Sequence, residues 1–232
     1  PLSLSTPGYV FARPLGRDFG GVRVAWSRDL GGLPVDRRVT EVIDGCRRVF
    51  EAIGCRVDDA EPDWAGADEA FKTLRAWEMA QAFTALPDEA RGVLKETLRW
   101  NIDQGLALEV ADVARAERLR GKVYHRVREL METYEFMVLP VNQVPPFDVS
   151  VRYPDEIEGV AMETYIDWMK SCYYISSLGL PSASVPCGFT PEGLPVGVQI
   201  VGRHHDDFGV LQLANAFESL TRFGERLPGV LG

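Results

Sequence analysis

Cys187 is the residue whose type and surroundings first suggest chemistry. It lies in SVPCGF, and His204 and His205 follow it by 17 and 18 residues. A cysteine thiolate within hydrogen-bond reach of an imidazole is a nucleophile and base pair. However, Cys187 lies in an apolar strand pattern with no helix start after it, which favours burial as a small hydrophobic side chain. A Cys187–His hydrolase therefore stays as an alternative.

Other residues with catalytic side chains favour structural roles. His125 lies in a charged helical pattern, which is typical of a solvated surface. Asp58 and Asp59 point to opposite faces of a strand, and Asp206 and Asp207 precede a helix and suit its capping. Nucleophile-elbow, phosphate-loop and zinc-protease motifs are absent. With three histidines and four cysteines lacking C-x-x-C spacing, we expect no metal and no cofactor.

The overall composition is that of an ordinary globular protein, with 46% apolar and 25% charged residues. A net charge of -9 argues against a nucleic-acid partner. We find no apolar run long enough to span a membrane and no export leader, so we expect a soluble, cytoplasmic chain without a membrane partner. The opening PLSLSTPGYVFARPLG lacks an initiator methionine and a helix or strand pattern, and we interpret it as a linker entered midway.

The elements that must position these residues begin with a strand, a helix and a strand over residues 22–60. VRVAW alternates and is β-branched, and the following segment has apolar residues at helical spacing. Asp36 is the expected N-cap of this helix, and Gly54 its end. Two strands joined in this way are usually parallel.

Residues 66–134 have a helical pattern almost throughout. Pro87 suits a first helical position, and Gly105 suits a C-terminal stop. Residues 136–223 then predict a strand, a proline-rich loop of the kind that lines a pocket, a helix over 161–178, two strands joined by TPEG, and a last helix. Strands interleaved with helices indicate the α/β class.

Aromatic residues gather in ETYIDWMKSCYYIS, within the helix expected over 161–178. They suit either a pocket wall or a buried stripe. Tyr165, Trp168 and Tyr173 lie at helical spacing, which favours the buried stripe.

Residues 179–203, GLPSASVPCGFTPEGLPVGVQIVGR, followed by DDFGVLQLANAFE, resemble the C-terminal signature region of the amidase-signature family. The pattern of that family is Gly-x-Pro-Ala-x-Ser-Val-Pro-x-Gly, a turn, Gly-Leu-Pro-x-Gly-x-Gln, and a helix ending near a Glu. The matching residues are Gly179, Pro181, Ser184, Pro186, Gly188, Gly193, Leu194, Pro195, Gly197, Gln199, Gly202 and Glu218. Looser, collinear similarity in PLSLS, GGVRVAWSRDLGGLPVD and YEFMVLPVNQVPP extends it over nearly the whole chain.

The resemblance implies an α/β fold with a mixed sheet and flanking helices, incomplete without an N-terminal portion. Residues 1–232 would be the C-terminal portion of one amidase domain. It also implies hydrolysis of a carbon–nitrogen amide bond by a Ser-cis-Ser-Lys triad carried in a Gly/Ser-rich segment. Nothing in this sequence matches that segment, so we expect no catalytic residue in this chain and no activity from it alone.

The substrate-pocket candidates lie in the proline-rich loop and in the segment before the hairpin. They are Asn142, Gln143, Val144, Pro145, Pro146, Phe147, Ser176, Ser177, Leu178, Gly179 and Leu180. Ser176 replaces an asparagine found in many relatives. Met169 stands where the A-type subunits of glutamine-dependent tRNA amidotransferases have an acidic residue, unless a gap brings Asp167 there. This departure favours a stand-alone amidase that acts on a small-molecule amide.

A non-catalytic function is the second class of hypothesis, as a scaffold, partner-binding or dimerisation chain. If the missing N-terminal portion shares the sheet, this chain exposes an unpaired strand edge and an apolar face. Such surfaces tend to self-associate.

Overall fold

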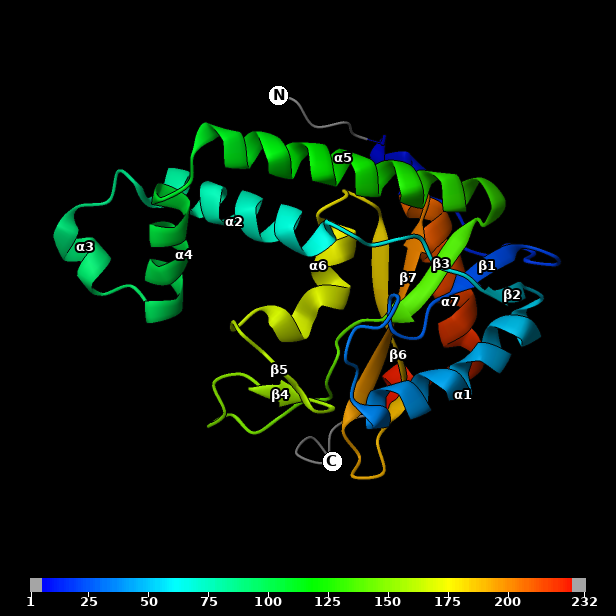
Figure 1. Ribbon diagram of the computed structural model, residues 1–232. Helices are drawn as coiled ribbons and strands as arrows, with labels where there is room; N and C mark the ends of the chain where they lie inside the picture. Colours follow the sequence, from blue (N-terminus) through cyan, green and yellow to red (C-terminus); the bar gives the residue numbers. More distant parts are fainter. Residues whose placement is uncertain (1–5, 227–232) are drawn as a thin grey trace. The chain divides into compact units, whose positions relative to one another are not determined.

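The computed structural model describes residues 6–226 and has two compact units (Figure 1). One unit holds the residues up to Pro62 and those from Val127 onwards, and it contains the sheets. The other unit, Asp63–Arg126, is helical.

A five-stranded mixed sheet organises the first unit. Its order is β2-β1-β3-β7-β6, and β1 runs parallel to both β2 and β3, whereas β7 is antiparallel to β3 and β6. The strands are β1 (Arg23–Trp26), β2 (Arg56–Asp59), β3 (Phe136–Pro140), β6 (Ser182–Phe189) and β7 (Pro195–Gly202). The α/β class and the mixed sheet expected from the sequence are thereby confirmed.

Two helices, α1 (Arg37–Ile53) and α7 (Asp207–Thr221), pack on one face of this sheet. Val198 and Ile200, alternate residues of β7, are buried with them because successive strand side chains point to opposite faces. The ends of α1 are the predicted ones. Asp36 accepts a hydrogen bond from the Arg38 N–H, and Gly54 adopts the left-handed conformation, with φ of 109°, that ends many helices.

Gln199 and Ser171 mark the other face of the sheet. The side chain of Gln199 donates to the Ser171 carbonyl at 3.3 Å, which connects β7 to α6 (Lys170–Ser176). The first unit also contains the short strands β4 (Glu156–Ile157) and β5 (Val160–Ala161) and the 3-10 helices η1 (Gly8–Ala12), η2 (Asp167–Met169) and η3 (Phe223–Glu225).

The helix expected over 161–178 is wrong in its first part, because the helical segment begins only at η2. The Asp167 carboxylate accepts hydrogen bonds from the Thr164 N–H at 2.6 Å and from the Thr164 hydroxyl at 2.9 Å. A side chain that reaches back three residues in this way caps a helix start. The turn therefore begins at Thr164.

The second unit consists of α2 (Ala67–Phe83), α3 (Asp88–Gly92), α4 (Glu96–Leu106) and the first part of α5 (Val110–Thr133). Pro87 precedes α3 as its N-cap, one position earlier than expected. Gly105 is not the predicted stop, because α4 continues to Leu106. A Cβ at Gly105 would lie 2.0 Å from the Ala76 carbonyl oxygen and 2.7 Å from the Ala80 Cβ. Gly105 therefore allows α4 to approach the backbone of α2.

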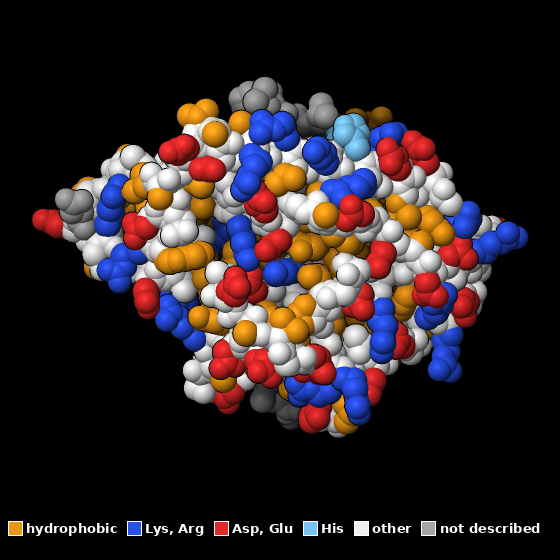
Figure 2. Space-filling model, viewed as in Figure 1, with side chains coloured by type: hydrophobic (Ala, Val, Ile, Leu, Met, Phe, Trp, Pro, Cys, Tyr) orange, Lys and Arg blue, Asp and Glu red, His pale blue; other side chains and the backbone are white. Residues whose placement is uncertain are grey.

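On the surface, acidic and basic side chains are interspersed, with hydrophobic side chains exposed between them, over the face drawn in Figure 2. Within residues 6–226, no helix combines the length and the apolar character needed to cross a bilayer.

The contact between α2 and α4 predicts the effect of adding one methyl group. Gly105→Ala should destabilise the second unit by about 1–3 kcal/mol or more, because the new Cβ overlaps backbone atoms that cannot move separately. Urea unfolding followed by circular dichroism measures this. Gly121→Ala in α5 is the matched control, since nothing lies within 4 Å of its Cβ position. There the higher helix propensity of alanine should stabilise by up to about 1 kcal/mol. Equal effects of both changes would contradict the close approach.

Candidate functional site

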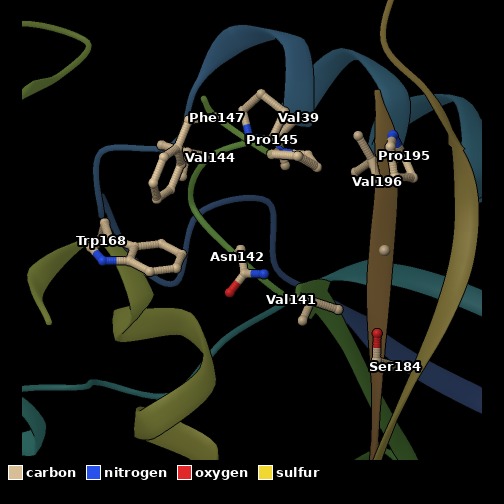
Figure 3. Close-up of a pocket in the computed structure, with 12 residues that line it drawn as sticks. Val39, Val141, Asn142, Val144, Pro145, Phe147, Trp168, Ser184, Pro195 and Val196 are labelled. Carbon is tan, nitrogen blue, oxygen red and sulfur yellow. The ribbon is translucent and has the colours of Figure 1, made fainter. Parts of the chain in front are cut away.

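A pocket of about 240 Å³ lies in the first unit (Figure 3). Residues from α1, the loop after β3, η2, β6 and β7 line it. They are Val39, Val141, Asn142, Val144, Pro145, Pro146, Phe147, Trp168, Ser184, Pro195, Val196 and Gly197.

The register of β7 brings these segments together. Pro140 at the end of β3 pairs with Val198, and the Val141 N–H donates to the Gly197 carbonyl at 3.4 Å. On the other side of β7, Ser184 pairs with Gln199. The proline-rich loop therefore leaves the sheet beside the first residues of β7.

The lining is apolar apart from the amide of Asn142 and the hydroxyl of Ser184. Phe147 and Trp168 meet edge to face, with ring centroids 5.4 Å apart and planes at 87°. The Asn142 Oδ1 accepts a hydrogen bond from the Cys172 thiol at 3.2 Å. Apolar walls with a few placed polar groups are typical of small-molecule sites.

Only part of the predicted pocket set lies in this lining. Asn142, Val144, Pro145, Pro146 and Phe147 line it, whereas Gln143 and the segment Ser176, Ser177, Leu178, Gly179 and Leu180 do not. The second segment leads into Ser182, which pairs with Val201. It therefore lies towards the end of β7 opposite to Pro195.

The sequence interpretation did not include several lining residues among the pocket candidates. Ser184, Pro195 and Gly197 belong to the family pattern matched by the hairpin, and this pattern was the available signal. Trp168 was interpreted as part of a buried stripe, and Val39 as part of a helix core. Nothing in their local sequence points to the pocket, because the lining depends on the packing of α1 and η2 around the loop.

Gln143 lies behind the pocket wall and is fully buried. Its Nε2 donates to the Pro34 carbonyl at 2.9 Å, and its Oε1 accepts from the Lys170 N–H at 2.7 Å. Its backbone carbonyl accepts from the Asp36 N–H at 2.8 Å. One residue thus connects the segment before α1, the pocket loop and the start of α6.

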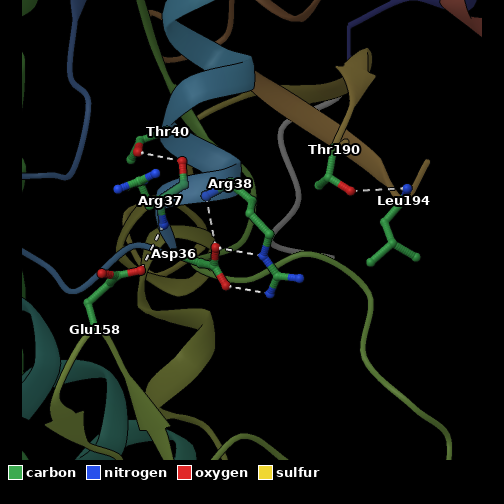
Figure 4. Close-up of polar contacts among 7 residues, drawn as sticks. All are labelled: Asp36, Arg37, Arg38, Thr40, Glu158, Thr190 and Leu194. Carbon is green, nitrogen blue, oxygen red and sulfur yellow. Dashed lines mark hydrogen bonds and ion pairs between the residues drawn. The ribbon is translucent and has the colours of Figure 1, made fainter. Parts of the chain in front are cut away.

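The first turn of α1, which carries Val39, is held by two carboxylates (Figure 4). The Arg37 N–H donates to Glu158 Oε1 at 2.9 Å. Asp36 accepts from the Arg38 N–H at 2.9 Å and from the Arg38 guanidinium at 2.6 and 3.0 Å. The hydrogen bond from the Arg38 side chain lowers the pKa of Asp36, against the opposing effect of burial. Figure 4 also shows Thr190, whose hydroxyl accepts from the Leu194 N–H just before β7.

Cys187 does not form the nucleophile and base pair considered as an alternative. It is 2% exposed, and the Cys46 thiol donates to its carbonyl at 2.8 Å. The neighbouring Cys46 thiol and burial raise the pKa of Cys187, so its thiolate is disfavoured. His204 and His205 are exposed beyond Gly202, whereas Cys187 lies near the TPEG turn at the other end of β6 and β7. Five or more residues of extended strand separate the two places, roughly 16 Å or more.

Asp167 is the acidic residue that a sequence gap would bring to the glutamine-recognition position of the amidotransferases. Its side chain is 3% exposed and accepts two hydrogen bonds from Thr164. It is therefore part of the helix start, and it is absent from the pocket lining.

Comparison with known proteins identifies the family. The family model Amidase matches residues 3–211, so the chain belongs to the amidase family. The acylamidase of Rhodococcus erythropolis is 30% identical over 231 residues, which cover 98% of this chain and 48% of that protein. The glutamyl-tRNA(Gln) amidotransferase of Thermodesulfovibrio yellowstonii matches through its A-type subunit, which is 23% identical over 242 residues, covering 94% of this chain and 49% of that one.

Solved structures show the same fold. A bacterial aryl acylamidase of the amidase-signature enzymes superposes with a TM-score of 0.81 at 23% identity, covering 91% of this chain and 46% of that one. 6-Aminohexanoate cyclic dimer hydrolase gives a TM-score of 0.81 at 18% identity, covering 99% and 50%. The chain thus spans about half the length of these relatives, and the resemblance seen in the sequence is confirmed.

The contacts of Gln143 predict a stability effect. Gln143→Leu keeps the volume but leaves the buried Pro34 carbonyl and Lys170 N–H without their partner, at about 1–3 kcal/mol for each group. A thermal melt should show a clear fall in Tm. The neighbouring change Asn142→Ala removes a side chain from the pocket surface and should have the smaller effect. An equal effect of the two variants would contradict the connecting role of Gln143.

The lowered pKa of Asp36 predicts a pH dependence. Its ionised form is favoured in the folded state, so its contribution is complete above its ordinary pKa of 3.8 and is lost as the pH falls through the lower folded value. Asp36→Asn keeps a capping oxygen but loses the charge. At pH 7 this variant should be less stable by about 1 kcal/mol or less, since the Arg38 pair is partly exposed.

Urea unfolding of both forms between pH 7 and pH 2.5 measures that difference, which cancels the titration of other carboxylates. The difference should shrink towards zero at the acid end. A constant difference over this range would show that the charge of Asp36 is not involved.

Proposed function

We propose that this chain is the C-terminal part of an amidase domain that hydrolyses a carbon–nitrogen amide bond, and that it supplies a wall of the substrate pocket. The observation that carries the proposal is the apolar pocket built from the family's signature hairpin and its proline-rich loop. The family match runs without interruption through the helical unit, which supports treating both units as parts of one domain.

The chemistry of amide hydrolysis supports assigning bond cleavage to residues outside this chain. The reaction needs a nucleophile, a base that accepts its proton, and donors for the developing oxyanion. Ser184 brings the one hydroxyl among the lining residues, and none of these described residues is a His, Lys, Asp or Glu. We therefore assign the Ser-cis-Ser-Lys triad to a segment that this chain does not contain. The chain itself binds and orients the substrate and excludes water.

A stand-alone amidase fits this site better than a glutaminase. Glutamine carries an ammonium and a carboxylate, and burying either without a partner is costly. The Asp167 carboxylate is committed to Thr164, and the pocket wall is uncharged. The 30% identity to an acylamidase also supports this choice. The free thiols Cys46, Cys55, Cys172 and Cys187 support a cytoplasmic location.

The edge of β6 is our candidate for the attachment of the remaining portion of the domain. β6 is an eight-residue strand and the last strand of the sheet within residues 6–226, and Ser182 and Ser184 are exposed on it. An unpaired strand edge is a template for further pairing. Without that portion, the same edge favours self-association, and a partner-binding scaffold is the second candidate function for this reason.

The proposal predicts that the purified chain shows no amide turnover. Anilides and aliphatic amides should be hydrolysed no faster than in buffer, after a sizing column has defined the oligomeric state. The positive control is the chain produced together with a Ser-Ser-Lys segment from the relative most similar to it. Hydrolysis by the chain alone would overturn the proposal if Ser184→Ala abolished it, since the nucleophile would then lie in this pocket.

A further inference from the structure

The pocket has a shape and a polarity that restrict what it can hold. We infer that it binds the uncharged, planar ring of an aromatic amide, an inference that rests on the proposed function and specifies its substrate class. Among the described lining residues, none is ionisable, and the wall consists of valines, prolines and two aromatic rings. A charged group placed there would lose its hydration without gaining a counter-ion.

The size of the pocket fits a substituted ring. An apolar cavity of roughly 150 Å³ is large enough to admit benzene. The volume here is about 240 Å³, which leaves room for a ring together with the atoms that join it to an amide. In the view of Figure 3, the polar ends of Asn142 and Ser184 lie towards one end of the pocket, and Phe147, Pro145 and Pro195 lie towards the other. A ring at the apolar end would direct its amide towards the polar end.

The aromatic pair gives the ring a preformed partner. Trp168 is fixed by donation from its Nε1 to the Tyr165 carbonyl at 2.9 Å, so its polar atom is already satisfied outside the pocket. Phe147 contacts it edge to face and is 40% exposed. Aromatic rings prefer edge-to-face or offset arrangements, and each such contact contributes about 0.5–1.5 kcal/mol beyond simple burial. A third ring adds to this pair without reorganisation.

Gly197 provides flat space in the wall formed by β7. A Cβ at this position would lie 3.1 Å from both the Ser184 Oγ and the Val141 Cγ2, two atoms of lining residues. The glycine therefore leaves open a space that even alanine would occupy. A planar group can lie against a strand at such a position, whereas a bulkier three-dimensional group meets the neighbouring side chains.

Binding to the chain itself tests the inference without any turnover. Calorimetry or ligand-observed NMR would compare acetanilide with hexanamide and with glutamine. We expect acetanilide to bind at least about tenfold more tightly than either. Gly197→Ala should weaken the binding of acetanilide more than that of hexanamide. Trp168→Leu should weaken acetanilide by roughly two- to tenfold, the range for one aromatic contact, and Trp168→Phe should retain most of the affinity.

Ser177→Ala, outside the pocket lining, is the matched control and should change nothing. Thermal melts identify any variant that fails to fold, and the second substituted position then decides. No binding of acetanilide, equal binding of the three compounds, or unchanged binding in both Gly197→Ala and Trp168→Leu would overturn the inference. Ring binding without hydrolysis in the fuller protein would overturn only the proposed function. Hydrolysis without a preference for rings would overturn only this inference.

Discussion

The antiparallel register of β7 between β3 and β6 is the constraint on which the rest of the site depends. It places Pro140 opposite Val198 and Ser184 opposite Gln199, so segments that are distant in the sequence meet at the start of β7. A shift by one residue would exchange the two faces of the strand and move Val198 and Ile200 out of the core shared with α1 and α7. The buried core therefore fixes the register, and the register fixes the pocket.

Polar groups near the pocket are used to hold it together. Gln143 satisfies backbone groups from two other segments, Asp167 caps a helix start, and Asp36 begins α1. Buried polar groups must be paired, so residues placed in this way are not available to a ligand. The result is a wall that is rigid and largely apolar. Such a wall positions a substrate, while cleavage of an amide needs groups of a different kind.

The local features were those best predicted from the sequence. Asp36 and Gly54 correctly mark the ends of α1, because capping depends on neighbouring residues. Gly105 was misinterpreted, because its function is to admit the backbone of α2, which a local pattern cannot show. The helix before β6 was drawn too long for a related reason. Apolar spacing continued upstream, whereas a single side-chain hydrogen bond determined where the helix starts.

The sequence by itself determined the family, the α/β class and the proline-rich loop as part of a pocket wall. Those features are encoded in residue order and in the spacing of glycines and prolines. Only the tertiary structure decided that Val39 and Trp168 face the pocket, that Gln143 lies behind it, and that Cys187 is far from both histidines. The physical reason is that a pocket is formed by the ends of several elements at once. Its lining depends on strand register and helix packing, and neither is a property of any one segment.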